Sequence, residues 1–469
     1  MKTVASYNEY PSEHELHGHR QQIDEILHDT PWTDIIQSSC RIDKLPNEIL
    51  DLILYHLSAH DLTRLASTCR KFTEHTAKDI LWAKLVNSHL PHHISDPGSF
   101  DSFRRLYLAH LSYWFIPQYK IWFSDHNHTG NLILARYDNR RGVIDAYRII
   151  ADKGATAFHF WESHPEVMIQ AFNPEVSLWL DDPVLLLKDR DPSARVAPCQ
   201  TWMAERRMSM PAEAQHLFNS LILCPNGTEP IDNTESLDDT EATGGTDAGL
   251  WPPQLIPTNN RISRVTQPLK LPEHASEVSE AGFRIRRWAH FRFGLQAGLA
   301  SDNEAIFSYA TLAPCLYTPT KEKPYQGIWV GDYSAHGCEF LLIFQQDPAR
   351  TDLEEGEDEH NLTSQDVVQK GSLRAVKLTG DPNVPRGELS FSADDIGPGG
   401  LICVADSQPF TGARIVRSKG HVAGLGFRDD SFIDSQLILI STDCLAHYWA
   451  EMGHVSYYRR VDIDALLQI

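Results

Sequence analysis

The clearest candidate for ligand chemistry is the stretch Gly380-Asp-Pro-Asn-Val-Pro-Arg-Gly387. Its two prolines each fix a backbone φ angle, and its Asp and Asn side chains can accept hydrogen bonds from their own backbone, so the loop should be preorganised. A preorganised loop loses little conformational entropy when it binds, so we predict that Asp381 and Asn383 contact a substrate. A rigid turn between two strands, without any ligand, would use the same residues.

A second candidate is the basic and aromatic stretch Arg284-Ile-Arg-Arg-Trp288. Guanidinium groups bind carboxylates and phosphates through paired, charge-assisted hydrogen bonds. We therefore predict that Arg284 and Arg286 contact an acidic or phosphorylated substrate. The same alternation is also typical of a strand with one solvated face.

The other reactive residue types do not form a recognisable catalytic or metal site. The eight cysteines contain no CxxC pair, and His92-His93 and His126-Asn-His128 lack cysteine or carboxylate partners at metal-binding spacing. No HExxH, GxSxG, Walker A or GxGxxG motif occurs, and no cysteine has the neighbours of an activated thiolate. We therefore expect a protein that is not an enzyme and that has neither a metal nor a cofactor.

The charge of the chain limits its partners. It has 469 residues and a formal net charge of −21, which argues against binding to nucleic acid or to an anionic membrane by electrostatics. The amino end has no apolar signal segment, and no apolar run is long enough for a membrane span. The scattered cysteines suit a reducing compartment. These features predict a cytoplasmic or nuclear location, with no membrane partner.

Helices must position the apolar residues near the amino end. Pro46 suits a first helical turn, where its missing N–H costs nothing. The apolar residues that follow recur at helical spacing: Ile49, Leu50, Ile53, Leu54 and Leu57. Ser58 and Asp61 resemble a capping box that begins a second helix. We predict four short helices in residues 39–90, after a weakly ordered tail in residues 1–38.

Strand-like segments dominate the rest of the chain. After a helical connector in residues 91–112, short runs of branched and aromatic residues are separated by Gly, Pro and Asp turns, as in residues 131–150. Such strands favour an antiparallel sheet that closes into a barrel and leaves no open edge. We predict a β-barrel domain over residues 113–469, with acidic or Pro-rich insertions at about 225–280 and 345–370. The fold class is therefore α+β, with several domains.

The first predicted helix carries more apolar surface than a small bundle can bury. Its apolar side chains cover more than half of a helical wheel, and a domain of about 45 residues is only marginally stable alone. The chain resembles an F-box protein through the following pattern: Leu45-Pro46-x-Glu48-Ile49-Leu50, Leu57-Ser58, Asp61-Leu62, Leu65, Thr68-Cys69-Arg70 and Leu81-Trp82. The resemblance implies docking on a Skp-type adaptor and, through it, on a cullin–RING ubiquitin ligase.

The same resemblance implies which side chains contact the adaptor. By position they are Leu45, Pro46, Ile49, Leu50, Ile53, Leu57, Leu62, Leu65 and Trp82. The alternative is that these residues form only the core of a helical domain. Burial of one Leu or Ile is worth about 1.5–3 kcal/mol, and several left uncovered would promote aggregation. The energetics therefore favour docking.

A second resemblance covers the C-terminal half of the chain. The residues that carry it are Gly327-Ile-Trp-Val-Gly331, Tyr333, His336-Gly337, Thr379 to Gly387, Gly412 and Gly424-Leu-Gly-Phe427. They are similar to the β-barrel substrate domain of the F-box-only proteins that target D-type cyclins, although no Cys/His zinc constellation is present. The resemblance implies a barrel that captures a short peptide end of a target protein.

Two functions are compatible with these patterns. The first is the substrate-recognition subunit of a Skp–cullin–F-box ubiquitin ligase, in which the barrel holds a protein substrate while a separate enzyme transfers ubiquitin. The alternative is a β-barrel that binds a small ligand or has hydrolytic activity, with the helices as an accessory docking module. A sealed apolar lumen with converging polar groups would favour the alternative, and an interior filled by side chains with an open groove at one rim would favour the receptor.

Overall fold

The computed structural model describes residues 42, 45–124, 129–155, 157–188, 203–211, 213, 216–226, 271–289, 304–347 and 370–468. The predicted tail at residues 1–38 lies outside this part of the chain, as do residues 227–270 and 348–369, which make up most of the two predicted insertions. The chain divides into two compact units, Met1–Leu85 and Val86–Ile469.

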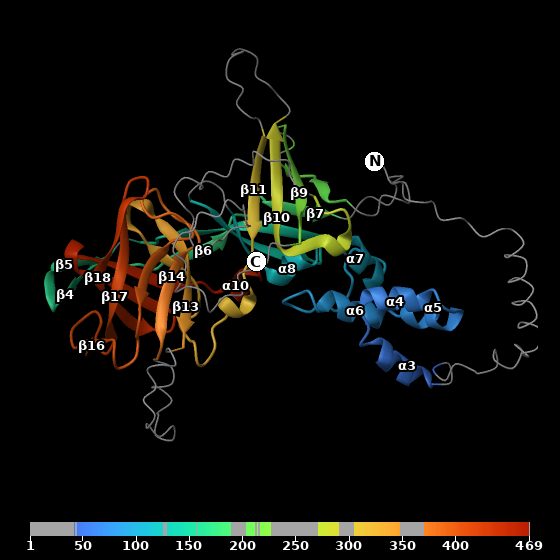
Figure 1. The fold of residues 1–469 in the computed structure, drawn as a ribbon, viewed down its shortest axis with the longest axis horizontal. Helices are drawn as coiled ribbons and strands as arrows, with labels where there is room; N and C mark the ends of the chain where they lie inside the picture. Colours follow the sequence, from blue (N-terminus) through green and yellow to red (C-terminus); the bar gives the residue numbers. More distant parts are fainter. Residues whose placement is uncertain are drawn as a thin grey trace, which may run out of the picture. The chain divides into compact units, whose positions relative to one another are not determined.

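Four short helices follow one another in the N-terminal unit, and the last of them continues to residue 87. They are α3 (Asn47–Leu54), α4 (Ala59–Ala66), α5 (Arg70–Thr76) and α6 (Asp79–Asn87) (Figure 1). The Ser58 hydroxyl accepts a hydrogen bond from the Asp61 N–H at 3.2 Å and so caps α4, as its sequence predicts. Leu50, Leu54 and Leu62 are buried. The predicted set of short N-terminal helices is confirmed.

Polar contacts also join these helices. The Trp82 indole N–H donates to the Thr76 carbonyl at 2.8 Å, so the buried ring has its one donor satisfied. The Asp51 carboxylate on α3 accepts a hydrogen bond from Lys78 and lies 2.7 Å from His75 Nδ1 on α5. Asp51 therefore connects the first helix to the third helix and to the turn that follows it.

An open antiparallel sheet follows the short helices α7 (Phe103–Ala109) and α8 (Phe115–Tyr119). Its nine strands are β1 (Ile121–Ser124), β2 (Asn131–Asp138), β3 (Val143–Asp152), β6 (Glu175–Leu178), β7 (Leu185–Lys188), β8 (Glu205–Met208), β9 (Leu217–Pro225), β10 (Val278–Ala289) and β11 (Glu304–Ala310). Their order is β6-β3-β2-β1-β11-β10-β9-β8, with β7 also paired to β3. The hairpin of β4 (Phe158–Trp161) and β5 (His164–Gln170) forms a separate small sheet.

A closed barrel of eight antiparallel strands forms the C-terminal part. Its strands are β12 (Gly327–Asp332), β13 (Cys338–Gln346), β14 (Ser372–Lys377), β15 (Leu389–Ala393), β17 (Arg414–Gly424), β18 (Arg428–Ser441), β19 (Cys444–Trp449) and β20 (His454–Arg460). The order β15-β14-β13-β12-β20-β19-β18-β17 closes because β15 also pairs with β17. The short strand β16 (Leu401–Val404) extends the sheet beside β17, and α10 (Ile463–Leu466) ends the described chain.

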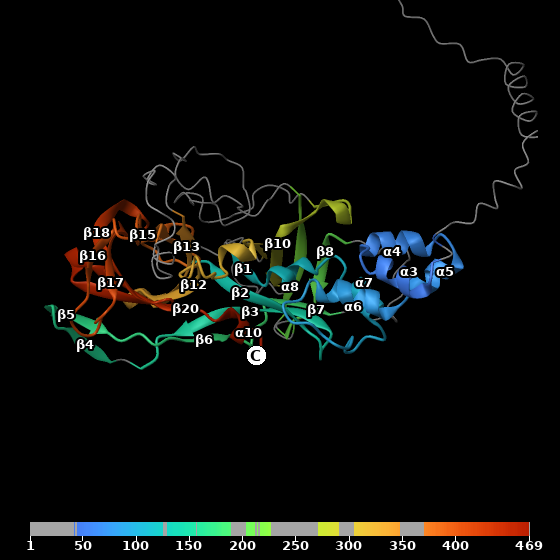
Figure 2. The same cartoon turned by 90° about the horizontal axis from the view of Figure 1, so that it is seen from below.

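Three apolar clusters hold the second unit together. Trp329, Phe391 and Tyr458 belong to the cluster inside the barrel. Trp122 belongs to a second cluster, which lies on one face of the open sheet. A third cluster joins the open sheet, the outer side of the barrel and the β4–β5 hairpin, whose Trp161 packs into it. Figure 2 shows the hairpin beside the barrel strands β17 and β18.

The predicted antiparallel β-barrel is confirmed, but it comprises residues 327–460. The earlier strands form an open sheet with a core of its own, which the sequence does not distinguish from the barrel. Strand structure also extends into the edges of both predicted insertions, because β10 begins at Val278 and β13 ends at Gln346. Within the described residues, no helix is long and apolar enough to cross a membrane.

Candidate functional site

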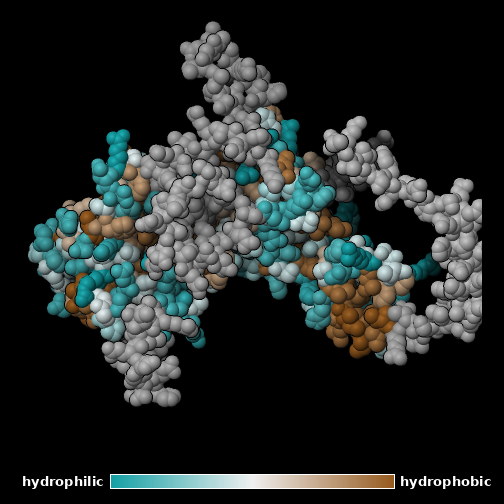
Figure 3. Space-filling view, in the orientation of Figure 1, coloured by the Kyte–Doolittle hydropathy of each residue, from teal (hydrophilic) through white to brown (hydrophobic). Residues whose placement is uncertain are grey.

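The outer face of α3 exposes an unusual amount of apolar surface. Ile49 and Ile53 are 44% and 40% exposed, and Leu52 is 62% exposed. Ile80, near the start of α6, is 65% exposed. Figure 3 shows the resulting hydrophobic patch over the region that Figure 1 labels α3. Monomeric proteins rarely leave such a patch uncovered unless it binds something.

A surface pocket with a volume of about 340 Å³ lies within this patch. The residues that line it are Glu48, Asp51, Leu52, Tyr55, Ile80 and Leu81. The Lys84 ammonium lies 4.4 Å from the centroid of the Tyr55 ring and helps to fix it. A pocket with such apolar walls suits a large apolar side chain.

The structure separates the nine predicted adaptor contacts into three groups. Pro46, Ile49 and Ile53 are exposed and available to a partner. The half-buried residues are Leu45, Leu57 and Leu65. The remaining three, Leu50, Leu62 and Trp82, are at most 2% exposed. These three are corrected to core residues of the helical unit, because a fully buried side chain cannot touch a partner without unfolding its surroundings.

Three exposed residues were missed in the prediction of this face: Leu52, Tyr55 and Ile80. Leu52 and Tyr55 lie on the side of the α3 wheel opposite the buried Leu50 and Leu54. An apolar residue on the face away from a helix's own core is the signal that could have identified them. Leu52 extends the exposed apolar arc of α3 that contains Ile49 and Ile53, and Ile80 adds apolar surface from α6.

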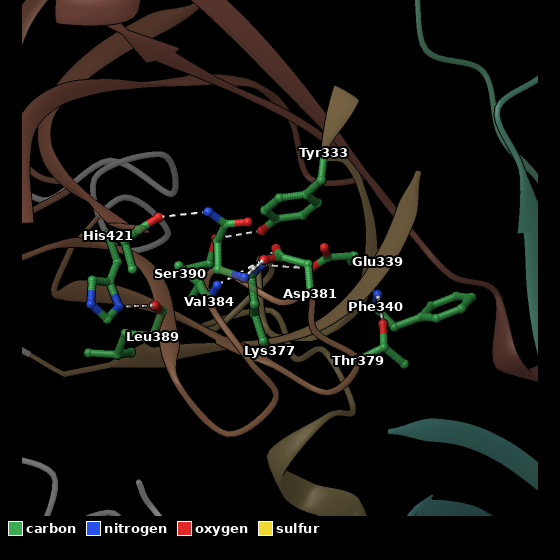
Figure 4. Close-up of polar contacts among 12 residues, drawn as sticks. Tyr333, Glu339, Phe340, Lys377, Thr379, Asp381, Val384, Leu389, Ser390 and His421 are labelled. Carbon is green, nitrogen blue, oxygen red and sulfur yellow. Dashed lines mark hydrogen bonds and ion pairs between the residues drawn. The ribbon is translucent and has the colours of Figure 1, made fainter. Parts of the chain in front are cut away.

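The 380–387 loop joins β14 to β15 and lies over a buried cluster of charges, shown in Figure 4. The Lys377 ammonium donates a hydrogen bond to Asp381 Oδ2 at 2.6 Å and lies 2.8 Å from Glu339 Oε2. It also lies 4.2 Å from the centroid of the Tyr333 ring. The Tyr333 hydroxyl in turn hydrogen-bonds to Ser390. We call Glu339, Lys377 and Asp381 the barrel charge cluster.

Asp381 also organises the loop itself. Its Oδ1 atom accepts hydrogen bonds from the N–H groups of Asn383 and Val384 at 2.6 and 2.8 Å, which is the geometry of an Asx turn. The Asn383 side-chain amide donates to the Ala423 carbonyl at 2.9 Å, and the Gly426 N–H donates to the Pro382 carbonyl at 2.9 Å. The loop is therefore preorganised and attached to the hairpin formed by β17 and β18.

The pKa values of the two carboxyl groups of the cluster are shifted in opposite directions. Burial raises the pKa of Glu339 to about 8, although the Lys377 charge opposes the shift and the Asp381 charge adds to it. Burial also acts to raise the pKa of Asp381, but the charge and hydrogen bond of Lys377 outweigh it, so this pKa lies below its ordinary value. The surroundings therefore favour the ionised form of Asp381 and the protonated form of Glu339.

The four predicted substrate contacts do not come together. Asp381 and Asn383 lie in the barrel, whereas Arg284 and Arg286 lie on β10 of the open sheet. Arg286 forms an ion pair with Glu205 at 3.2 Å, and both arginines are half-buried on one face of the strand. The Asp381 side chain is 6% exposed and is already bonded to Lys377. A ligand that reached Asp381 would have to replace one of these bonds.

Large side chains fill the described part of the barrel. Trp329, Phe391 and Tyr458 are fully buried there, and the His447 ring packs against Phe391 with the ring centroids 4.8 Å apart. This filling argues against a ligand lumen in the described part of the barrel. Among the described residues, no group of three or more His, Cys, Asp or Glu side chains is placed to hold a metal ion.

Comparisons with known proteins match the two regions that contain these residues. A family model described as "F-box-like" matches residues 42–88, which contain α3 to α6 up to residue 87. A model described as "Cyclin D1 binding domain" matches residues 309–465, which contain the whole closed barrel. F-box and substrate-binding domains of this kind are typically non-catalytic, and their combination indicates an F-box substrate receptor.

One curated relative matches part of the chain. The chain is 24% identical over 183 residues to Protein EXECUTER 2, chloroplastic, of Arabidopsis thaliana. The match covers 38% of this chain and 27% of that protein, so the chain spans about a quarter of the length of this relative. The two family matches describe more of the protein than this relative does. The chain carries an F-box-like domain at residues 42–88 and a domain that matches the Cyclin D1 binding family at residues 309–465.

Proposed function

We propose that this protein is the substrate-recognition subunit of a Skp–cullin–F-box ubiquitin ligase. The N-terminal helices bind a Skp-type adaptor, which connects the protein to a cullin–RING ligase. The barrel binds a segment of a target protein. Ubiquitin transfer is performed by a separate enzyme, so this chain accelerates the reaction by holding the target close to it. No nucleophile in this chain takes part.

The observation that carries the proposal is the uncovered apolar face of α3. Covering the exposed parts of Ile49, Leu52, Ile53, Tyr55 and Ile80 yields on the order of 5 kcal/mol of hydrophobic free energy. Part of this is offset by the entropy lost on association. The face is also held rigid, since Asp51 joins α3 to His75 and Lys78. A rigid apolar face loses little conformational entropy when a partner covers it.

The 380–387 loop supports the assignment of the barrel as the substrate-binding part. Its backbone is fixed by Asp381 and by the links to Ala423 and Gly426, so a target segment would meet a preformed surface. Asp381, Asn383, Arg284 and Arg286 stay our predicted substrate contacts. The loop and the β10 face lie in different sheets, so they would contact different parts of a target.

We also propose that the protein acts in the cytoplasm, the nucleus or both. Six cysteines in the described residues, including the buried Cys224 and Cys444, are free thiols, as is usual in reducing compartments. Imaging of a fluorescent fusion of the full chain tests the location. Signal confined to the secretory pathway or to an organelle other than the nucleus would contradict the proposal.

Adaptor binding by matched variants of the full chain tests the function. We expect Ile49→Asp/Ile53→Asp to weaken binding of a purified Skp-type adaptor by about 100-fold or more, because two charges would be buried in an apolar interface. The control is Leu108→Asp/Leu111→Asp, since these residues are 49% and 50% exposed near α7. The control should bind like the wild type. Unchanged affinity of the α3 variant would refute the proposed recruitment.

A further inference from the structure

The barrel charge cluster contains more acids than bases. Glu339 on β13 and Asp381 in the 380–387 loop face a single ammonium, that of Lys377 at the end of β14. The charge of Glu339 also raises the pKa values of Tyr333, Tyr458 and Cys338, and all three groups are neutral at physiological pH. If both carboxyl groups were ionised, the cluster would bury one unbalanced negative charge.

The hydrogen-bond donors are divided unequally between the two acids. Asp381 accepts hydrogen bonds from Lys377 and from the N–H groups of Asn383 and Val384. Glu339 has the Lys377 ammonium nearby, but neither of its oxygens accepts a hydrogen bond of good geometry from a described residue. An ionised carboxylate with so few donors is costly to bury. A proton bound by the cluster is therefore carried by Glu339 and not by Asp381.

We propose that Glu339 binds a proton in the folded protein, that this proton leaves Lys377 free to hold Asp381, and that its loss at alkaline pH loosens the 380–387 loop. The pKa of Glu339, raised by burial to about 8, is consistent with this assignment. The side chains of Glu339, Lys377 and Asp381 are only 4%, 2% and 6% exposed, so the proton cannot be replaced by solvation of the charge in place.

The consequence of losing this proton follows from the geometry. When Glu339 releases its proton to solvent, two carboxylates compete for the Lys377 ammonium, which now lies 2.6 Å from Asp381 and 2.8 Å from Glu339. The bond between Lys377 and Asp381 weakens. Asp381 also caps the N–H groups of Asn383 and Val384, so any movement of its carboxylate disturbs the turn. The loop should therefore become more mobile above about pH 8.

The effect of this proton on target binding rests on the proposed function, because it assumes that the loop contacts the substrate. The protonation state and the loop mobility do not depend on that assumption. Both can be measured on the full chain without adaptor or substrate. A failure of the proton-dependent loop can therefore be distinguished from a failure of the receptor assignment.

Two measurements on the full chain test the inference. Carbon-13 NMR of the glutamate carboxyl groups should show a Glu339 resonance that titrates near pH 8 and that disappears in Glu339→Gln. Hydrogen exchange of residues 379–388, corrected for the intrinsic pH dependence, should show protection falling about tenfold between pH 7 and pH 9 in the wild type. In Glu339→Gln, protection should stay constant, because the neutral amide imitates the protonated acid.

Glu451→Gln, at an exposed residue after β19, is the matched control and should behave like the wild type. A Glu339 carboxyl that is already ionised at pH 6 in the wild type would overturn the inference, even if the Gln variant failed to fold. A Glu339 that titrates near pH 8 while the exchange of residues 379–388 is unchanged would also overturn it, since the proton would then not hold the loop.

Discussion

Neighbouring residues on α3 have opposite roles. Ile49 is 44% exposed, whereas Leu50 is completely buried. The Leu50→Ala substitution should destabilise the helical unit by about 2–5 kcal/mol because it leaves a cavity. Ile49→Ala should change stability by less than about 0.5 kcal/mol and weaken adaptor binding instead. Hydrogen exchange of α3 together with adaptor titration measures both effects. Equal destabilisation by the two substitutions would contradict this division.

Glu339 should make folding stability depend on pH in an unusual direction. Its pKa is about 8 in the folded protein against an ordinary 4.5, so between these values the folded state holds a proton that the unfolded state releases. Stability should therefore fall as pH rises through this window, by at most about 1.4 kcal/mol per pH unit, and should level off above pH 8.

Urea unfolding of the full chain at pH 5, 6, 7 and 8, followed by tryptophan fluorescence, measures this slope. Glu339→Gln should remove the contribution of Glu339, since the amide does not titrate, and Glu451→Gln should leave the wild-type slope in place. Identical slopes for wild type and Glu339→Gln would show that Glu339 is ionised when folded.

The sequence identified the loop but not the cluster beneath it. Asp381 and its turn follow from local chemistry, since Asp, Pro and Asn determine backbone conformation over a few residues. Lys377 lies in the strand Ser372–Lys377, whose alternation places it on the inward face with Leu373 and Ala375. That signal was available, but no local pattern shows that Glu339, nearly forty residues earlier, is its partner.

At the scale of elements, the barrel depends on the close approach of glycines to aromatic rings. A Cβ atom at Gly420 on β17 would lie 2.2 Å from the Trp449 ring of β19. Gly420→Ala should therefore force the ring to move and destabilise the barrel by about 1–3 kcal/mol. Gly424→Ala, at the end of the same strand, is the control, because its nearest neighbour would be 3.3 Å away.

Thermal unfolding of the two glycine variants, followed by near-UV circular dichroism, measures the difference. The transition of Gly420→Ala should move to lower temperature, and that of Gly424→Ala should move little. If both variants unfolded like the wild type, the packing of Trp449 against β17 would not limit barrel stability.

Local elements were predicted well where turn chemistry marks their ends. The hairpin expected in residues 131–150 is present as β2 and β3, with Asp138 paired to Val143 across the turn. The apolar residues in 448–452 are typical of a strand, but only the first two of these positions lie in one. β19 ends at Trp449, and residues 450–452 form a 3-10 turn that ends at Gly453 in the left-handed conformation. Ala450 and Met452 in this turn are apolar, so the local sequence resembles the end of a strand.

At the scale of the whole molecule, the division of the β region could not be read from the sequence. The open sheet requires β1 to pair with β11, so that Phe123 lies opposite Ala310. Barrel closure requires β15 to pair with β17. Both pairings join segments that are distant along the chain, and strand patterns do not specify which distant segments meet. One β-barrel domain was therefore predicted where a barrel and an open sheet exist.

The two compact units should respond independently to substitution. Ile49→Asp/Ile53→Asp should weaken adaptor binding without changing the unfolding of the barrel, and Gly420→Ala should lower barrel stability without changing adaptor affinity. The reason is that distant sites without shared partners have additive effects. Adaptor titration and thermal unfolding of both variants and of their combination test this. A combined effect that differs from the sum would show coupling between the units.

The strand pair that closes the barrel has fewer paired residues than the strand pairs on either side of it. β15 meets β17 through two residue pairs, Phe391 with Gly420 and Ser392 with Lys419, whereas β17 and β18 share ten. Because this pairing is so short, β15 and β17 can separate and pair again while the other strands of the barrel stay paired. Such local opening would turn part of the barrel into an open sheet. The amides of Phe391 and Gly420 should therefore exchange with solvent before those of any other barrel strand.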